Sequence, residues 1–279
     1  MDLDPQLTRE MVAAFLAEDV GHGDVTTRLT VDDSATGHAR IEARAPFVVA
    51  GLPVARACFE VAGPGSVSCE LVRDDGSLVE AGQPLAELEG SLASILTAER
   101  TALNLLARLS GTATMTWLFV EKIEGTAARI VDTRKTTPGL RLFEKYAVRV
   151  GGGRNHRFGL DDGILIKDNH IRAAGGVHEA VVRARNDAPH GLVVEVEVTD
   201  LEELDEAVAA GADAALLDNM SVDMVRDAVG RWGGKVLLEA SGGINLDNVR
   251  DYAEAGVDLI SVGALTHSAV AVDVALEVE

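Results

Sequence analysis

Residues 192–198 read LVVEVEV, a short aliphatic run in which Glu195 and Glu197 alternate with valines. Successive side chains of a β-strand point to opposite faces, so the two acids share one face and the valines occupy the other. If the valines pack against helices, both carboxylates face the interior of the fold. Two unpaired charges are costly to bury, so they need a cation, a substrate or basic partners there. A buried ion pair with Lys135 or Lys167 is the purely structural alternative.

Similar runs flank this one along the second half of the chain. They lie at residues 128–131, 163–166, 212–217, 235–240 and 257–262, with a candidate seventh strand at Tyr146–Val150. Stretches with a helical spacing of apolar residues separate them, at 177–185, 201–210, 221–231 and 245–255. Strands that alternate with helices are typical of a parallel sheet with crossover helices. Six or seven such units predict an α/β barrel or incomplete barrel, with a doubly wound sheet as the alternative.

The first hundred residues follow a different order. Helices are expected at residues 1–20 and 52–61, a strand within 37–51, a β meander over 66–89, and a long helix from Ser91 to about residue 124 that Gly111 could interrupt. The pattern changes after Gly125, and 279 residues allow either one large domain or a barrel with a smaller domain.

Composition limits the class of protein. The chain has 279 residues, of which 47% are hydrophobic, and no apolar run approaches the ~20 residues that span a bilayer. A net charge of −20 argues against binding to nucleic acid or to anionic membranes, which require a basic face. Residues 1–10 resemble neither a signal nor a transit peptide, and Cys58 and Cys69 match no zinc spacing. We therefore expect a cytoplasmic enzyme with reduced thiols.

The distribution of charge suggests a salt-adapted protein. Only five of the 25 basic residues are lysines, against 45 acidic residues. An acidic surface poor in lysine suits high salt, where screening weakens self-repulsion. We therefore expect a halophilic protein.

Polar residues follow nearly every predicted strand. The segments are DTRKT at 132–136, KDNH at 167–170, DN at 218–219, SGG at 241–243 and SVGA at 261–264. Sites in parallel α/β folds form at the carboxyl ends of the strands, so we expect these segments to meet in one site. A purely structural barrel has no need of this arrangement.

Two of these segments predict a phosphate site. Residues 241–243 precede the helix expected at 245–255, where glycines would let backbone N–H groups approach a phosphate at a helix N-terminus. Gly263, after the next strand, would complete the site, as in many barrels. His267 is either a loop residue or a further phosphate contact.

Basic residues gather in the same part of an otherwise acidic chain. They are Arg134, Lys135, Arg154, His156, Arg157, Lys167 and His170. Arginine suits bidentate binding of carboxylates and phosphates, so the cluster predicts a pocket for a multiply anionic substrate. Arg100, within the long helix, is by itself indistinguishable from a surface residue beside Glu99.

These segments, together with ERTALN at 99–104 and GGGRNHRFG at 151–159, follow the order found in the quinolinate phosphoribosyltransferase family, which the chain resembles over most of its length. The DTRKT and KDNH segments are the most specific. The resemblance implies an N-terminal α/β sandwich domain over residues 1–108, joined by 266–279, and an incomplete α/β barrel over 109–265. It also implies a homodimer with shared active sites, either as a free dimer or as part of a hexamer.

The resemblance further implies a reaction and the residues for it. Phosphoribosyl pyrophosphate and quinolinate would give nicotinate mononucleotide, pyrophosphate and CO₂, in the biosynthesis of NAD. Quinolinate would be held by Arg134, His156, Arg157 and Lys167, with Arg100 supplied by the partner subunit. The catalytic residues would be Lys135, near the pyrophosphate, and Glu197 and Asp218, at the ribose hydroxyls directly or through Mg²⁺. The 5-phosphate would be held by Ser241, Gly242, Gly243 and Gly263, with His267 as a candidate contact and Glu195 nearby.

Three alternatives stay open. Lys135 or Lys167 could be the amine of a Schiff-base lyase or aldolase. A related phosphoribosyltransferase that acts on another pyridine or base would share these motifs. A binding module that kept the fold would bind phosphoribosyl pyrophosphate without turnover, although two intact anion pockets argue against that function.

Overall fold

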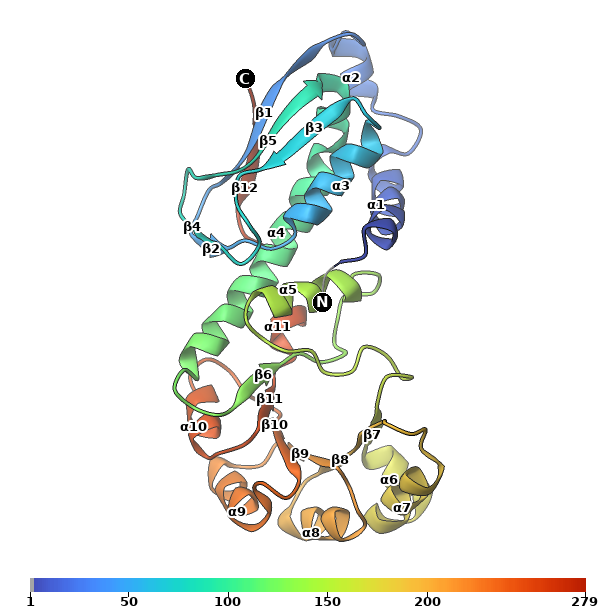
Figure 1. Cartoon of the computed structure of the whole chain (residues 1–279), viewed down its shortest axis with the longest axis vertical. Helices are drawn as coiled ribbons and strands as arrows, with labels where there is room; N and C mark the ends of the chain where they lie inside the picture. The colour runs from blue at the N-terminus through green and yellow to red at the C-terminus, as the bar shows by residue number, and fades with distance from the viewer. Residues whose placement is uncertain (1–2) are drawn as a thin grey trace. The chain divides into compact units, whose positions relative to one another are not determined.

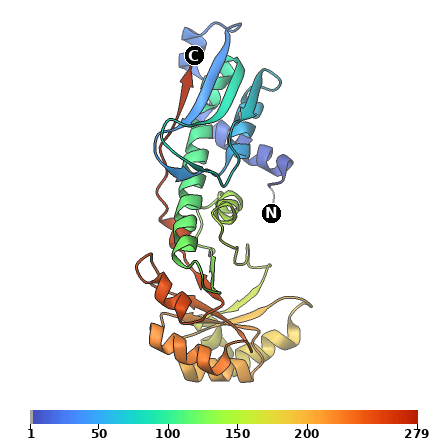
Figure 2. The same ribbon diagram turned by 60° about the vertical axis from the view of Figure 1, so that its left-hand side comes forward.

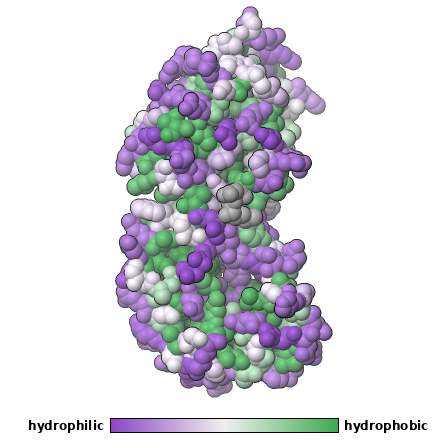
Figure 3. Space-filling view, in the orientation of Figure 1, coloured by the Kyte–Doolittle hydropathy of each residue, from purple (hydrophilic) through white to green (hydrophobic). Residues whose placement is uncertain are grey.

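The computed structural model describes residues 3–279. The chain forms two compact units, drawn in Figure 1 and described separately below. Unit 1 contains the residues up to Met115, Leu142–Gly152 and Ala269–Glu279, and unit 2 contains Thr116–Arg141 and Gly153–Ser268. Hydrophilic side chains cover much of the visible face of each unit, with apolar residues scattered among them (Figure 3).

Unit 1 is built on an antiparallel sheet with the strand order β12-β1-β5-β3. Its strands are β1 (Thr36–Ala43), β3 (Val67–Leu71), β5 (Pro84–Ser91) and β12 (Val274–Val278), and β2 (Phe47–Val48) pairs with β4 (Leu78–Val79) outside that sheet. The C-terminal strand β12 pairs with β1, so that Ile41 lies opposite Leu276. The last residues of the chain therefore complete a sheet made by the first hundred.

Helices complete unit 1. They are α1 (Pro5–Val20), α2 (Val25–Thr30), α3 (Leu52–Ala62), α4 (Leu92–Lys122), which continues into unit 2, and α5 (Arg141–Val150). The Asp4 carboxylate caps α1 by accepting the Leu7 N–H, and Val12 and Leu16 of this helix are buried. Helix α1 packs on α3, where Cys58 and Phe59 are fully buried. Burial of apolar side chains along one face thus fixes these helices to the unit.

Unit 2 is a six-stranded parallel sheet with the order β6-β11-β10-β9-β8-β7. Its strands are β6 (Arg129–Val131), β7 (Ile164–Ile166), β8 (Val194–Val198), β9 (Ala214–Asp218), β10 (Leu237–Ser241) and β11 (Leu259–Ser261). Its helices are α6 (Asp168–Ala174), α7 (Val177–Asp187), α8 (Leu201–Ala209), α9 (Val222–Trp232), α10 (Val249–Glu254) and α11 (Ala264–His267). Most of these helices lie on the outer side of the curved sheet (Figures 1 and 2).

Within residues 3–279, strands β6 and β7 do not pair with each other, so the barrel is incomplete. This confirms the predicted fold class. The alternation predicted for β8 is confirmed as well: its three valines are buried, whereas Glu195 and Glu197 line cavities inside the barrel.

The prediction of a strand at Tyr146–Val150 is wrong, because these residues end helix α5. Phe143, Ala147 and Val148 are fully buried, and their spacing of three to four residues gives the helix one apolar face. The barrel therefore has six strands and not seven. Gly111 does not interrupt α4, and the expected meander is altered because β4 leaves the sheet to pair with β2.

Cys58 and Cys69 carry free thiols, and burial raises their pKa values to about 12 and about 11, which makes both weak nucleophiles. Across the part of the chain that the structure describes, no helix combines the length and the apolar character needed to cross a membrane.

Gly111 of α4 allows a test of packing in unit 1, with Gly230 of α9 in unit 2 as its control. A Cβ atom on Gly111 would lie 2.1 Å from the backbone oxygen of Val270, whereas one on Gly230 would meet nothing within 4 Å. We expect Gly111→Ala to lower the free energy of unfolding by about 1–3 kcal/mol through overpacking. Gly230→Ala should raise it by up to ~1 kcal/mol, because alanine favours helix. Denaturant unfolding of both variants checks this, and equal effects would contradict the packing of the C-terminal segment against α4.

Candidate active site

A cavity of about 330 Å³ opens at the carboxyl ends of the barrel strands, and we call it the strand-end cavity. Its lining consists of Thr133, Arg134, Lys135, His156, Arg157, Leu165, Lys167, Glu197, Leu216, Asp218, Glu239, Ser241 and Ser261. All of these residues belong to unit 2. The structure thus brings together most of the basic and acidic residues that the sequence singled out at separate strand ends.

The loop after α5 carries His156 and Arg157 into this cavity. Residue Arg154 forms a parallel bridge with Val131, so the loop continues the sheet beyond β6. The fully buried Asp132 accepts the His156 backbone N–H at 2.9 Å and the Asn155 side-chain amide at 2.6 Å. A buried carboxylate needs such donors, and in meeting that need Asp132 fixes the loop.

Two arginines that line the cavity, Arg134 and Arg157, lie close enough for their charges to interact. Burial, and then the nearby charge of Arg134, lowers the pKa of Arg157, whose guanidinium donates to the Gly163 carbonyl at 2.8 Å. The Nε atom of Arg134 is buried and makes no hydrogen bond within residues 3–279. Like charges held close together in a low-dielectric cavity favour a bound anion, and guanidinium groups suit carboxylates and phosphates.

Acidic groups lie beside these bases. Lys167, which directly follows β7, forms an ion pair with Glu197 of β8. Asp218 ends β9 and accepts a hydrogen bond from the Asn219 side-chain amide at 2.8 Å. Asn219 itself has φ 55°, a left-handed conformation that asparagine tolerates better than most residues. The cavity therefore presents cations and carboxylates side by side.

Glycines permit two close approaches around the cavity. Gly242 has φ 90°, and a Cβ on it would lie 2.3 Å from the Asn219 side-chain oxygen. A Cβ on Gly263 would lie 3.1 Å from both Lys135 Cδ and His267 Nε2, so Gly263 allows these two side chains to lie close together. Any larger residue at either position would disturb a residue that lines or borders the cavity.

The helix expected at residues 245–255 begins only at Val249, so that prediction is wrong at its N-terminus. The Asn245 side chain accepts the Asp247 N–H at 2.9 Å, and the Asn248 side chain accepts the Asn245 N–H at 2.8 Å. These local bonds favour a turn over a helix. Gly243 therefore precedes a turn and not the N-terminus of a helix.

Comparison with known proteins agrees with this geometry. The description "Quinolinate phosphoribosyl transferase" matches residues 24–110 as its N-terminal domain and residues 112–277 as its C-terminal domain. A nicotinate-nucleotide pyrophosphorylase [carboxylating] from Mycobacterium leprae is 44% identical over 281 residues, which cover 99% of each chain. This chain belongs to the quinolinate phosphoribosyltransferase family.

Solved structures show the same likeness. The nicotinate-nucleotide pyrophosphorylase from Francisella tularensis is 42% identical, with a TM-score of 0.93 over 100% of this chain and 98% of its own. The nicotinate-nucleotide pyrophosphorylase from Ehrlichia chaffeensis is 36% identical, with a TM-score of 0.93 over 100% of both chains. This member of the family therefore has the fold of its solved relatives.

Some candidate residues of this phosphoribosyltransferase family member are not in the lining of the strand-end cavity. They are Arg154, Gly242, Gly243, Gly263 and His267, together with Arg100, Glu195 and His170. Arg100 lies on α4 in unit 1, where its side chain is 63% exposed and its nearest acidic partner is Glu99 at 3.5 Å. Glu195 lines a second cavity and lies 3.0 Å from His156 Nε2. His170 accepts the Lys167 backbone N–H at 2.9 Å and so supports the first turn of α6.

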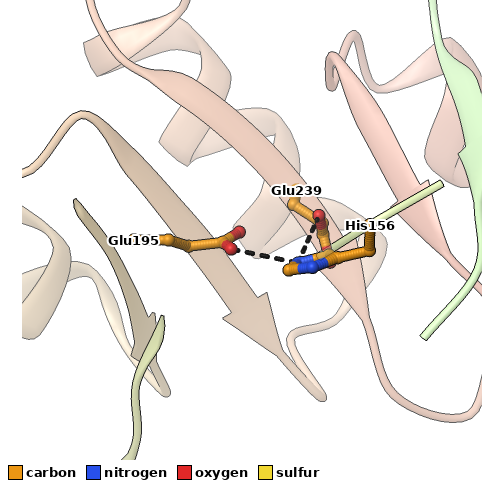
Figure 4. Close-up of side chains that lie close together, drawn as sticks. All are labelled: His156, Glu195 and Glu239. Carbon is orange, nitrogen blue, oxygen red and sulfur yellow. Dashed lines mark ion pairs between the residues drawn. The ribbon is translucent and has the colours of Figure 1, made fainter. Parts of the chain in front are cut away.

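The sequence analysis missed Glu239 as a site residue. It is fully buried on β10, and its carboxylate lies 3.7 Å from His156 Nε2 and makes no hydrogen bond within the described chain (Figure 4). The sequence did contain a signal for Glu239. Residues 237–241 read LLEAS, and the two-residue period of a strand, which predicted the inward acids of β8, also places Glu239 and Ser241 on the inward face.

The protonation of Glu239 predicts a pH effect on stability. Burial first, and then the charge of Glu195, raises the pKa of Glu239 from 4.5 to about 7. Between these pH values the folded chain keeps a proton that the unfolded chain has released. The contribution of this proton to the free energy of unfolding is therefore complete below pH 4.5 and is lost as the pH rises through about 7. Relative to Glu239→Gln, the wild-type protein should lose at most ~1.4 kcal/mol per pH unit across this range.

Urea unfolding of both proteins at a series of pH values measures this difference. The Gln variant is the control for all other titrating groups, because both proteins share them. A constant difference from pH 4.5 to 7 would show that Glu239 is ionised throughout.

Proposed function

We propose that this protein transfers the phosphoribosyl group of phosphoribosyl pyrophosphate to quinolinate and releases pyrophosphate, CO₂ and nicotinate mononucleotide, in the biosynthesis of NAD. The observation that carries the proposal is the strand-end cavity, where a buried arginine Nε without a protein partner lies among further cations and next to two carboxylates. A dianionic pyridine and a phosphorylated sugar need both kinds of group.

The basic residues would bind the pyridine substrate. Arg134, Arg157 and Lys167 line one cavity together with His156 and would hold the two carboxylates of quinolinate. Lys135 also lines this cavity and would lie near the pyrophosphate and the reacting carbon. Burial of Arg157 supports this role, because electrostatic attraction to a carboxylate is stronger where water is excluded.

The sugar phosphate would occupy the opposite wall of the proposed site. Ser241 lines the cavity, and the backbone N–H groups of Gly242, Gly243 and Gly263 would bind the 5-phosphate without the help of a long helix. His267 lies close to Gly263, which supports a contact with the same phosphate. Glu197 and Asp218 would bind the ribose hydroxyls.

Glu197 and Asp218 also fit Mg²⁺ that accompanies phosphoribosyl pyrophosphate. They are carboxylates on the adjacent strands β8 and β9, both line the strand-end cavity, and Mg²⁺ prefers oxygen ligands. Bound there, the ion would offset the negative charge of the pyrophosphate group.

The reaction would rest on positioning and on fixed charges. Departure of pyrophosphate from C1 of the ribose leaves positive charge on that carbon, which Glu197 and Asp218 would stabilise electrostatically. The pyridine nitrogen then donates its electron pair to C1. The positively charged ring draws the electrons of the bond to the 2-carboxylate as CO₂ leaves, and a proton from solvent replaces it. No covalent enzyme intermediate is required.

A Schiff-base mechanism receives less support from the geometry. It would need a neutral lysine amine as nucleophile. Lys167 is instead engaged in an ion pair with Glu197, and Lys135 lies close to Gly263 and His267, where an anion would be bound.

Turnover tests the proposed function directly. Purified protein with quinolinate labelled at the 2-carboxylate, phosphoribosyl pyrophosphate and Mg²⁺ should release labelled CO₂ and form nicotinate mononucleotide. Lys135→Ala and Glu197→Ala should each lower kcat by about 100-fold or more, because each removes a fixed charge at the reacting centre. Lys122→Ala, at an exposed lysine on α4, is the control that should keep full activity. Loss of activity only through unfolding, seen as a lower Tm, would favour a structural role for the two residues.

We also propose a homodimer, either free or as part of a hexamer, in which Arg100 reaches the quinolinate of the neighbouring subunit. The exposure of Arg100 and its weak pairing with Glu99 support this role. Arg100→Ala mixed with Lys135→Ala should partly regain activity, because a hybrid dimer carries one site with both residues intact. Mass spectrometry would show whether the subunits have exchanged. If they have exchanged and no activity returns, the shared site is contradicted.

Finally, we propose that the protein works in the cytoplasm of a salt-adapted cell. Its net charge of −20 and its five lysines support this, as do the two free thiols. Activity that is highest at molar salt and declines on dilution is the corresponding expectation.

A further inference from the structure

His156 lies between two cavities. Besides the strand-end cavity, a second cavity of about 330 Å³ is lined by Val193, Ala214, Leu237 and Leu259 at or near the starts of the strands, and we call it the rear cavity. In a parallel sheet the starts and ends of strands lie at opposite edges. His156, Arg157 and Glu239 line both cavities, so these side chains form the floor that separates them.

A backbone hydrogen bond indicates which tautomer of His156 is present. The Arg157 N–H donates to His156 Nδ1 at 2.7 Å, and a backbone amide can only be a donor. Nδ1 must therefore accept and carries no proton, which places the proton of the neutral ring on Nε2. Nε2 faces Glu195 at 3.0 Å and Glu239 at 3.7 Å (Figure 4).

Both carboxylates lie buried beside that nitrogen. Glu195 is 7% exposed and Glu239 is fully buried, and they come from β8 and β10 on either side of β9. Asp132 holds the His156 backbone from the other side by accepting its N–H at 2.9 Å. The ring is thus held at its backbone, at Nδ1 and at Nε2, with both nitrogens turned toward protein groups.

We propose that Glu195 and Glu239 are positioning residues that hold His156 as the Nε2–H tautomer across the floor of the strand-end cavity, so that Arg134, Arg157 and Lys167 supply the charge that meets the substrate carboxylates. This inference deepens the proposed function and rests on it for the identity of the substrate. In this inference Glu195 contacts His156 and does not contact the substrate. One hydrogen-bond partner on an imidazole nitrogen is known to fix the tautomer and orientation of such a ring.

A metal ion is the alternative reading of this cluster. Ligand atoms of His156, Glu195 and Glu239 lie within 4.8 Å of one another, a spacing that could hold a cation. Coordination would require an unprotonated Nε2 and a proton on Nδ1. The Arg157 N–H on Nδ1 opposes that tautomer, so the geometry favours the hydrogen bond to Glu195.

The tautomer can be measured without turnover. The ¹⁵N signals of histidine-labelled full-length protein distinguish a protonated from an unprotonated ring nitrogen, and His156→Gln identifies the signal of interest among seven histidines. At neutral pH and without ligands, we expect His156 to have a protonated Nε2 and an unprotonated Nδ1. A proton on Nδ1, alone or in a doubly protonated ring, would overturn the proposal. So would Mn²⁺, added alone, that binds stoichiometrically to the wild type and not to Glu239→Gln.

Kinetics then test the consequence for the reaction. Glu195→Leu and Glu239→Leu should lower kcat by about 10- to 100-fold, with the KM for phosphoribosyl pyrophosphate changed by less than about twofold, since only the ring behind the pyridine site is released. Glu239→Gln should recover most of the activity and keep the tautomer, because it preserves the shape of the side chain and a polar group beside His156. Glu202→Gln, at an exposed acid of α8, is the matched control.

The outcomes separate this inference from the proposed function. If no CO₂ is released but the wild-type tautomer is as expected, the substrate assignment fails and the arrangement of His156 stands. Full activity in a folded Glu239→Leu protein whose His156 signal has changed would show that the tautomer has no role in catalysis. If the Leu variants do not fold, the wild-type spectrum and Glu239→Gln still decide the proposal.

Discussion

The cost of removing charged side chains from water inside a six-stranded barrel determines how this protein is organised. Each strand turns every second side chain toward the interior, and here those positions include Glu195, Glu197 and Glu239. The first two are paired with His156 and Lys167. Glu239 instead has a raised pKa, because burial and a neighbouring carboxylate favour its neutral form. The pattern of paired and unpaired groups therefore marks the part of the interior that is available to a substrate.

The open edge of the barrel allows this arrangement. Because β6 and β7 do not pair in the described chain, the loop that carries His156 and Arg157 can extend the sheet beside β6 and enter the interior. Asp132 fixes the loop through buried hydrogen bonds to its backbone and to Asn155. A closed barrel would fill this space with a strand, so the missing strand and the site are structurally linked.

Much of the fold could be predicted because its signals are local. The alternation in LVVEVEV correctly predicted a strand with its acids inward, and polar strand ends correctly predicted most of the cavity lining. The prediction failed at residues 146–150, because the predicted strand began after Phe143. Phe143 belongs to the same apolar face as Ala147, and that face is helical. It failed again at residues 245–248, where asparagine side chains bond to the backbone and form a turn.

The sequence by itself determined which side chains share a strand face and which follow a strand, because a two-residue period and the direction of parallel strands are set by the local backbone. Only the tertiary structure decided that Glu239, which is distant in sequence from Glu195 and His156, shares a buried cluster with them. It likewise decided which nitrogen of His156 carries the proton and why the pKa of Glu239 is raised. Desolvation and pairing depend on neighbours from other strands, and those neighbours exist only once the barrel has formed.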